Sequence, residues 1–165
     1  MSTNLSTNPY AQELEGADPI VSLEEGHRRV AALLDGWPVH AFERTYAPGK
    51  WTTRQLLIHL AHMELIFGDR VRFALSTPNY VVSPFEQDEW LALDESVDAD
   101  SALAAYQGMR RMNLALFRSL TAAQRSHRFE HPERGTIDVE WVIAALAGHE
   151  RRHLRHLQAI ADLDD

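Results

Sequence analysis

Apolar residues recur at steps of three and four positions through much of the chain, a period typical of amphipathic helices. The strongest pattern runs from Arg54 to about Ser76, where Thr52 and Gln55 form a potential N-terminal capping box and Pro78 ends the pattern. Its apolar stripe consists of Leu56, Leu60, Met63, Phe67, Val71 and Ala74. This stretch therefore predicts a long helix with one face directed at a core.

Three further helices are predicted from the residues that flank them. They are expected from Ser22 to Leu34, from Asp98 or Asp100 to Leu120, and from Thr136 or Asp138 to about Asp162. The first helix would begin with a capping box of Ser22 and Glu25. Thr121 with Gln124 predicts one short additional turn of helix after the third.

The segments between these helices show little strand signal. Residues 78–97 form a long connection in which one short turn of helix would fit, and residues 127–135 are expected to be a loop. Short strands are the alternative near 80–85 and 127–137. Four long helices predict an all-α four-helix bundle, an architecture whose core is a usual place for metal sites.

Length, charge and composition narrow the possible partners. A chain of 165 residues suits one domain, and we expect residues 1–17 to be a loose polar segment ahead of a single domain over residues 18–165. The formal net charge of −8 disfavours nucleic-acid binding, which depends on Lys and Arg neutralising phosphates. The sequence has no apolar run long enough for a membrane span and no secretion signal at its N-terminus, so we expect a cytoplasmic protein without a membrane partner. Because there is no cysteine, any metal must be held by nitrogen and oxygen.

Two histidines of the last predicted helix lie where apolar residues are expected. Val142, Leu146, Leu157 and Ile160 form the apolar stripe of this helix. At about 100° per residue, His149 and His153 fall inside that stripe, and His156 lies at its edge. A buried imidazole needs partners for both nitrogens, and a shared metal would satisfy two adjacent rings. The alternative is two core histidines, each hydrogen-bonded to another side chain. The other histidines, His27, His40, His127 and His131, are expected to be on the surface or to cap other groups.

A metal site needs a third ligand, and the second helix offers candidates. His59 lies at the flank of its apolar stripe, His62 points about 60° further toward solvent, and Glu64 flanks the opposite side. We therefore predict His59 as the third ligand, with His62 and Glu64 as fallback or supporting residues. Three nitrogens with the remaining positions open to water or substrate are typical of a reactive site rather than a sealed structural one.

Residues 149–153 also spell H-E-x-x-H, the spacing of a zinc protease helix. Such proteases take a third ligand from downstream, but the position six residues after His153 is Ala159. The sequence therefore disfavours a protease. Glu150 is kept as a candidate catalytic residue, either as a base or as a group that orients a ligand. The alternative is an exposed glutamate paired with Arg54 or Arg155.

Two blocks resemble the DinB-like (DinB/YfiT) superfamily over roughly residues 20 to 160. They are K-W-T-T-R-Q-L-L-I-H-L-A-H-M-E, which begins at Lys50, and G-H-E-R-R-H-L, which begins at Gly148. The segment R-G-T-I-D-V-E-W before the last helix also agrees. The resemblance implies an up-down-down-up bundle that is often a homodimer. It also implies a divalent metal, commonly nickel or zinc, on a triad that falls on His59, His149 and His153.

The reaction implied by the resemblance is less specific. Some members are similar to S-transferases and isomerases that use low-molecular-weight thiols such as bacillithiol or mycothiol as cosubstrates. We expect a small-molecule substrate and a metal-dependent enzyme of the thiol S-transferase type. The alternatives are a metal-dependent hydrolase and a non-catalytic module that binds a metal or small ligand. The pocket is expected between the second, third and fourth long helices, where Arg110 and Asn113 would either contact substrate or have structural roles, with Arg110 reaching toward solvent. Trp51 is expected to pack in the core.

Overall fold

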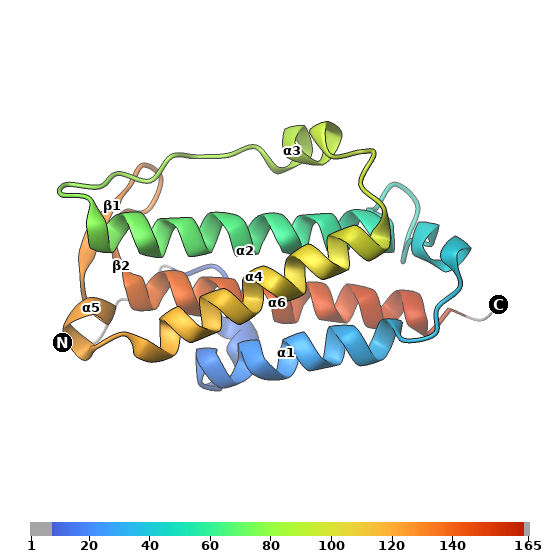
Figure 1. Cartoon of the computed structure of the whole chain (residues 1–165), viewed down its shortest axis with the longest axis horizontal. Coiled ribbons are helices and arrows are strands. Elements are labelled where there is room, and N and C mark those ends of the chain that lie inside the picture. Colours follow the sequence, from blue (N-terminus) through green and yellow to red (C-terminus); the bar gives the residue numbers. More distant parts are fainter. Residues whose placement is uncertain (1–7, 164–165) are drawn as a thin grey trace.

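The computed structural model describes residues 8–163 as a bundle of four long helices (Figure 1). The helices are α1 (Pro19–Leu34), α2 (Thr53–Ser76), α3 (Gln87–Leu93), α4 (Ala99–Ser119), α5 (Ala122–Arg125) and α6 (Val139–Ala161), with 3-10 turns at Ala11–Leu14 and Val39–Glu43 and strands β1 (Arg128–His131) and β2 (Gly135–Asp138). The four long helices run up, down, down and up in chain order, which confirms the predicted architecture.

The parallel course of α2 and α4 explains the long connection between them. These two helices run in the same direction and pack against each other, so the chain must return along the length of the bundle before α4 can begin (Figure 1). Residues 77–98 make this return and include the short helix α3. The predicted long connection with one turn of helix is therefore correct.

The helix starts follow local capping chemistry, with one correction. Thr52 and Gln55 form the predicted capping box of α2. Helix α1 instead begins earlier than predicted, because the Asp18 side chain accepts hydrogen bonds from the backbone N–H groups of Ile20 and Val21, and Pro19 occupies the first helical position. Ser22 is buried inside the helix and does not cap it.

Two alternative start points were predicted for each of the third and fourth long helices, and the structure shows which one is used. Asp98 caps α4 by accepting from the Ser101 N–H, and Asp138 caps α6 by accepting from the Trp141 N–H. The alternative start at Thr136 is wrong, since that residue lies in β2. Strands β1 and β2 pair antiparallel, so the loop predicted over residues 127–135 is mostly the first strand and turn of a hairpin.

Of the segment predicted to be loose, residues 1–7 lie outside the described part of the chain, and residues 8–17 are held against the bundle. The Asn8 side chain donates to the Trp141 carbonyl oxygen at 3.3 Å, Leu14 is buried, and Arg151 donates to the Leu14 carbonyl oxygen at 2.7 Å. Residues 8–17 therefore pack along α6. Individual side chains and backbone carbonyl groups make these contacts. The segment therefore needs no apolar residues at helical spacing, and its sequence shows none.

The core consists of two apolar clusters separated by a layer of buried polar side chains. One cluster includes the second half of α2 and the start of α6, and the other includes the start of α2 and the end of α6. We call the layer between them the polar waist, and it consists of His59, Glu64, Arg110, Asn113, His149, Glu150 and His153. Every long helix except α1 contributes side chains to it. At that level α1 has Gly26, where an added Cβ would lie 2.1 Å from Glu150 Oε2.

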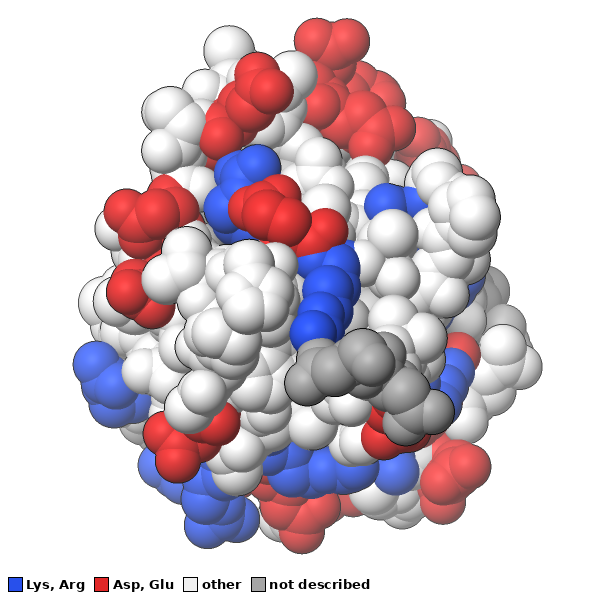
Figure 2. All heavy atoms as spheres, turned by 90° about the vertical axis from the view of Figure 1, so that its right-hand side faces the viewer, with Lys and Arg blue, Asp and Glu red and all other residues white. Residues whose placement is uncertain are grey.

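The described helices and the face drawn in Figure 2 limit the possible partners. None of its helices combines the length and the apolar character that crossing a bilayer would require. The end of the molecule drawn in Figure 2 carries both signs of charge, with acidic side chains gathered toward the upper edge and most Lys and Arg in the lower part of the view, interrupted by acidic and uncharged residues. That face therefore has no continuous basic surface.

Candidate metal centre

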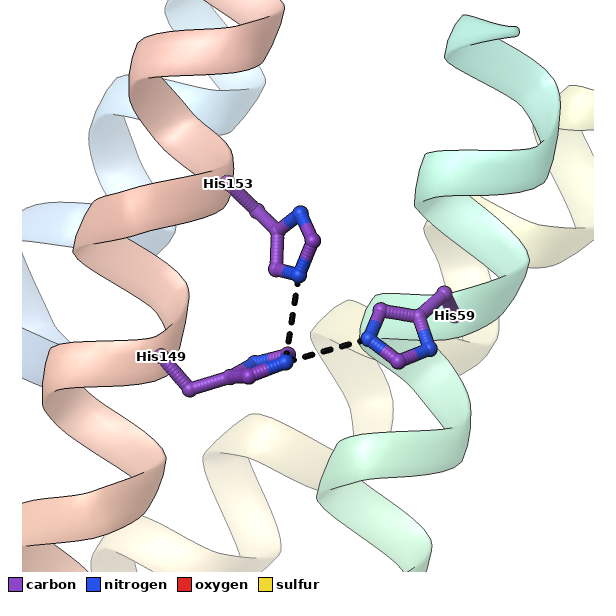
Figure 3. A group of neighbouring side chains, drawn as sticks. All are labelled: His59, His149 and His153. Carbon is purple, nitrogen blue, oxygen red and sulfur yellow. Dashed lines mark hydrogen bonds between the residues drawn. The ribbon is translucent and has the colours of Figure 1, made fainter. Parts of the chain in front are cut away.

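Three histidines converge in the polar waist. His59 extends from α2, and His149 and His153 extend from adjacent turns of α6 (Figure 3). The Nε2 atom of His149 lies 3.1 Å from Nε2 of His59 and 3.1 Å from Nε2 of His153. The exposed fractions of the three residues are 0%, 5% and 8%. The structure thus brings together the three residues that the helical wheels had selected.

The spacing of the nitrogens fits a cation better than a set of hydrogen bonds. Zinc–nitrogen bonds of about 2.0–2.1 Å in tetrahedral geometry place two nitrogens roughly 3.3 Å apart, close to the observed separations. Without a cation, one Nε2 atom of His149 would have to serve two neighbouring rings, although it can donate or accept only one hydrogen bond. The Nδ1 atoms of all three rings are buried and have no hydrogen-bond partner in the described chain. Three neutral nitrogens are a donor set suited to zinc or nickel.

Burial keeps the three rings neutral. Loss of solvation lowers the pKa of His59 to about 4 and, together with the neighbouring His59, lowers the pKa of His149 to about 3. Burial and then the two other rings lower the pKa of His153 further still. At neutral pH each ring therefore presents a free lone pair, and a metal ion need not displace a proton.

This lowering predicts that the metal-free protein loses stability in mild acid. In the unfolded chain these histidines titrate near 6.5, whereas the folded rings stay neutral to about pH 4. The unfolded state therefore binds more protons than the folded state as the pH falls through this window. Each ring that is protonated only in the unfolded chain lowers the free energy of unfolding by about 1.4 kcal/mol per pH unit. Urea unfolding in the presence of a chelator should give a lower free energy of unfolding at pH 5 than at pH 7.

The His149→Gln variant is the control for this pH effect. It removes one of the groups, so its unfolding free energy should depend on pH with a slope smaller by about one proton. An unchanged slope in the variant, or a wild-type stability equal at both pH values, would contradict the assignment of neutral buried rings.

Aromatic side chains pack against the imidazole rings of the triad. The Trp51 ring lies 4.7 Å from the His59 ring and 6.2 Å from the His153 ring, and Tyr10 meets His149 edge-on at 5.0 Å. The backbone of Tyr10 can approach α6 closely because the helix has Gly148 at the point of contact. A Cβ at this position would lie 2.2 Å from the Tyr10 carbonyl oxygen. Trp51 is half-buried and packs against one of the two apolar clusters, in line with the expectation, and its ring also covers the triad.

A pocket of about 390 Å³ opens beside the triad and reaches two of its histidines, His149 and His153. It is lined by Tyr10, Tyr46, Gly49, Lys50, Trp51, Leu56, Gln87, Asp88, His149, Arg152, His153 and His156. Of these described lining residues none comes from α4, so the pocket predicted between the second, third and fourth long helices lies elsewhere. It is enclosed by α6, the start of α2, the N-terminal segment, the turn before α2 and the start of α3.

The sequence did not reveal most of these pocket residues. Tyr10 belongs to a segment without periodicity, and Tyr46 and Lys50 lie in a connection whose path depends on the rest of the fold. Besides His149 and His153, the lining residues with a usable signal are Leu56, in the apolar stripe of α2, and His156, at the edge of the apolar stripe of α6. The His156 ring stacks on Tyr46 with centroids 4.6 Å apart.

Glu150 lies in a second cluster, with Arg110 and Glu64. The Arg110 Nη2 atom lies 2.7 Å from Glu150 Oε1, and the Tyr106 hydroxyl donates to the same oxygen. Arg110 also donates through Nε to Glu64 Oε1 at 2.9 Å and through Nη1 to the Leu23 carbonyl oxygen at 2.8 Å. The structure therefore does not bring Glu150, Glu64 or Arg110 into the group of three histidines. Burial raises the pKa of Glu150, against the opposing effect of Arg110.

Several expectations for individual residues of this cluster need correction. Glu150 is buried and does not pair with Arg54 or Arg155, which pair with Glu43 and Glu13. Arg110 is buried and does not reach solvent. The Asn113 side chain donates to the backbone carbonyl and carboxylate oxygens of Glu64 at 2.8 and 2.9 Å, so it positions that acid and lies away from the pocket.

The remaining histidines also lie outside the triad. His62 was expected to point toward solvent, but it is buried, with its Nε2 atom 2.6 Å from Asp94 Oδ2 and its ring edge-on to Trp90. The return connection covers this face of α2, which a wheel of one helix cannot show. His131 is buried in the hairpin, where its Nδ1 atom accepts a hydrogen bond from the Glu133 N–H at 3.2 Å, so it has one of the two roles expected of it. His40 and His127 are exposed, as expected.

Sequence relatives match most of this chain and cover most of their own length in doing so. The sequence profile of the DinB superfamily matches residues 22–157. A protein of Oceanobacillus iheyensis, provisionally named as a metal-dependent hydrolase, is 31% identical over 137 residues, which cover 82% of this chain and 79% of the relative. Another protein of that organism with the same kind of name is 28% identical over 124 residues, which cover 74% of this chain and 72% of the relative.

Solved structures give the same picture. YfiT from Bacillus subtilis, described as a probable metal-dependent hydrolase with an unusual four-helix bundle topology, aligns with a TM-score of 0.78 at 26% identity over 86% of this chain and 83% of YfiT. The mycothiol-dependent maleylpyruvate isomerase aligns with a TM-score of 0.68 at 16% identity over 95% of this chain and 63% of the isomerase, a likeness of fold alone. The fold, the convergent histidines and the matched residues agree: the chain belongs to the DinB superfamily.

Proposed function

We propose that this protein is a metal-dependent enzyme that activates a small thiol for transfer to an electrophilic small molecule. The observation that carries the proposal is the convergence of three buried, neutral imidazoles beneath an open pocket. His59, His149 and His153 would hold the cation. Burial keeps the rings uncharged, so that each has one nitrogen with a free lone pair, and Trp51 and Tyr10 pack against the rings.

A divalent metal bound there would supply charge that lowers the pKa of a thiol, or of water, toward neutrality. The protein's own residues favour the thiol. In H-E-x-x-H hydrolases the glutamate between the histidines serves as the base, but here Glu150 is engaged by Arg110 and Tyr106 in the neighbouring cluster. A thiol ionises near pH 8.5 without help, so it needs a base far less than water does.

A metal-dependent hydrolase is the second candidate, because the curated relatives and YfiT carry that description. Its base would have to come from a residue other than Glu150. Among the pocket residues Asp88 has the suitable chemistry.

The proposal is tested with untagged protein loaded with zinc or nickel. The protein is mixed with 1-chloro-2,4-dinitrobenzene and, in turn, bacillithiol, mycothiol and glutathione, and conjugate is followed by absorbance. In this reaction a sulfur–carbon bond forms, chloride leaves and the thiol proton passes to solvent. We expect conjugation with at least one thiol well above the uncatalysed rate, and its loss in His149→Ala but not in His127→Ala, which alters an exposed histidine.

Two other outcomes would reject the thiol reaction. Ester or peptide hydrolysis that depends on His149, without conjugation, would establish the hydrolase. Tight metal binding without either reaction would favour a module that binds a metal or small ligand without catalysis.

A further inference from the structure

Two cationic side chains at the pocket have no partner within the described chain. Lys50, in the turn before α2, and Arg152, on α6, both line the pocket and are exposed. Neither forms an ion pair or a side-chain hydrogen bond with any of residues 8–163. The neighbouring Arg151 and Arg155 differ, because both pair with acidic residues of the N-terminal segment. The two cations that face the pocket are thus left available to a ligand.

Both cations lie at the same cavity as the candidate metal ligands. Lys50 and Arg152 share the lining of the pocket with His149 and His153. Glu13, which lies outside this lining, pairs with Arg155. Asp88 is the acidic side chain that faces Lys50 and Arg152 among the described lining residues, and its single charge does not balance two.

The rest of the lining suits a small molecule with a flat or apolar body. Tyr46, stacked on His156, forms one wall, while Trp51 and Tyr10 border the triad. A volume of about 390 Å³ accommodates a small metabolite rather than a polymer. In a chain of net charge −8, a pocket with excess positive charge concentrates small anions that the remaining surface would repel.

We infer that the pocket selects a small substrate that carries an anionic group, a carboxylate or a phosphate, and that Lys50 and Arg152 bind this group while the reacting atom faces the triad. The identity of the reacting atom, a thiol sulfur, rests on the proposed function. The presence of an anionic group on the substrate rests on the charges that line the pocket. Lys50 and Arg152 are the specificity-determining residues.

A matched pair of thiols tests this in protein loaded with cobalt(II), whose absorption spectrum reports on ligands near the metal. The probes are 3-mercaptopropionate and its neutral amide, 3-mercaptopropionamide, which have equal length and the same sulfur. In the Lys50→Gln/Arg152→Gln double variant, the dissociation constant of the anionic probe should rise about tenfold, as two solvent-exposed ion pairs are lost. That of the amide should stay within about twofold. Asp88→Asn should tighten binding of the anionic probe, and Arg111→Gln, which alters an exposed arginine of α4 that does not line the pocket, should leave it unchanged.

Equal weakening of both probes in the double variant, or weakening of neither, would overturn the inference. A different result marks failure of the proposed function: cobalt binds, yet neither thiol alters the spectrum. The anion site is then tested on its own by phosphorus NMR, through the broadening of inorganic phosphate by the bound cobalt. Broadening that disappears in the double variant supports the inference, and equal broadening in both proteins rejects it. Acetate added as a competitor then shows whether a carboxylate is preferred to a phosphate.

Discussion

Replacing His149 by alanine is expected to lower the affinity for zinc or nickel by more than about a hundredfold, since the loss of residues that only support a ligand already costs 10- to 100-fold. His149 is the most informative of the three histidines because its Nε2 atom lies 3.1 Å from those of both His59 and His153. Without it, two imidazoles from different helices remain, and water would have to complete the coordination. Competition against a chromophoric chelator, with untagged protein, measures this change and should give one metal per wild-type chain.

The matched control for this measurement is His156→Gln. His156 lines the same pocket one turn beyond His153 but is not part of the convergent group. Its replacement should change metal affinity by less than about threefold. Equal losses in both variants, or wild-type affinity in His149→Ala, would show that the ligands are not the three residues proposed.

The second large effect is expected from Arg110→Met, which should destabilise the protein by about 3–5 kcal/mol. The guanidinium is buried between the carboxylates of Glu64 and Glu150, and no other cation contacts them within the described chain. Its removal leaves two acids in a site where burial already raises the pKa of Glu150. Urea unfolding at pH 7 gives the free-energy change.

The sign of the pH dependence distinguishes lost charge pairing from lost packing. In Arg110→Met the buried Glu150 carboxyl of the folded protein holds its proton to higher pH than in the unfolded chain, so the loss of stability should shrink as the pH falls toward 5. Adding Glu64→Gln and Glu150→Gln should restore part of the stability at pH 7. A loss below about 1 kcal/mol, or one that does not depend on pH, would contradict a charge-paired cluster.

Sequence reasoning predicted best where one helix determines the answer. The spacing of Leu56 to Ala74 and the Thr52–Gln55 capping box define α2, and the positions of His149 and His153 within an apolar stripe predict their burial. These signals are local, because a helix fixes which side chains share a face.

The errors arose where a second element determines the environment. Glu150 was judged by its charge, yet Arg110 from α4 makes its burial tolerable, and Gly26 from α1 makes room for it. His62 was assigned to solvent because the wheel of α2 cannot include the return connection that carries Asp94. Tyr10 and Lys50 reach the pocket from irregular segments, so no periodic pattern marks them.

The polar waist has a mechanical consequence for the bundle. Charged and imidazole groups separate the apolar cluster at one end of the bundle from the cluster at the other end. Hydrophobic packing therefore does not by itself couple the folding of the two ends. A metal ion bound between α2 and α6 would cross-link the two helices at this level. The metal-bound protein would then unfold in one transition, and removal of the ion would let one end unfold before the other.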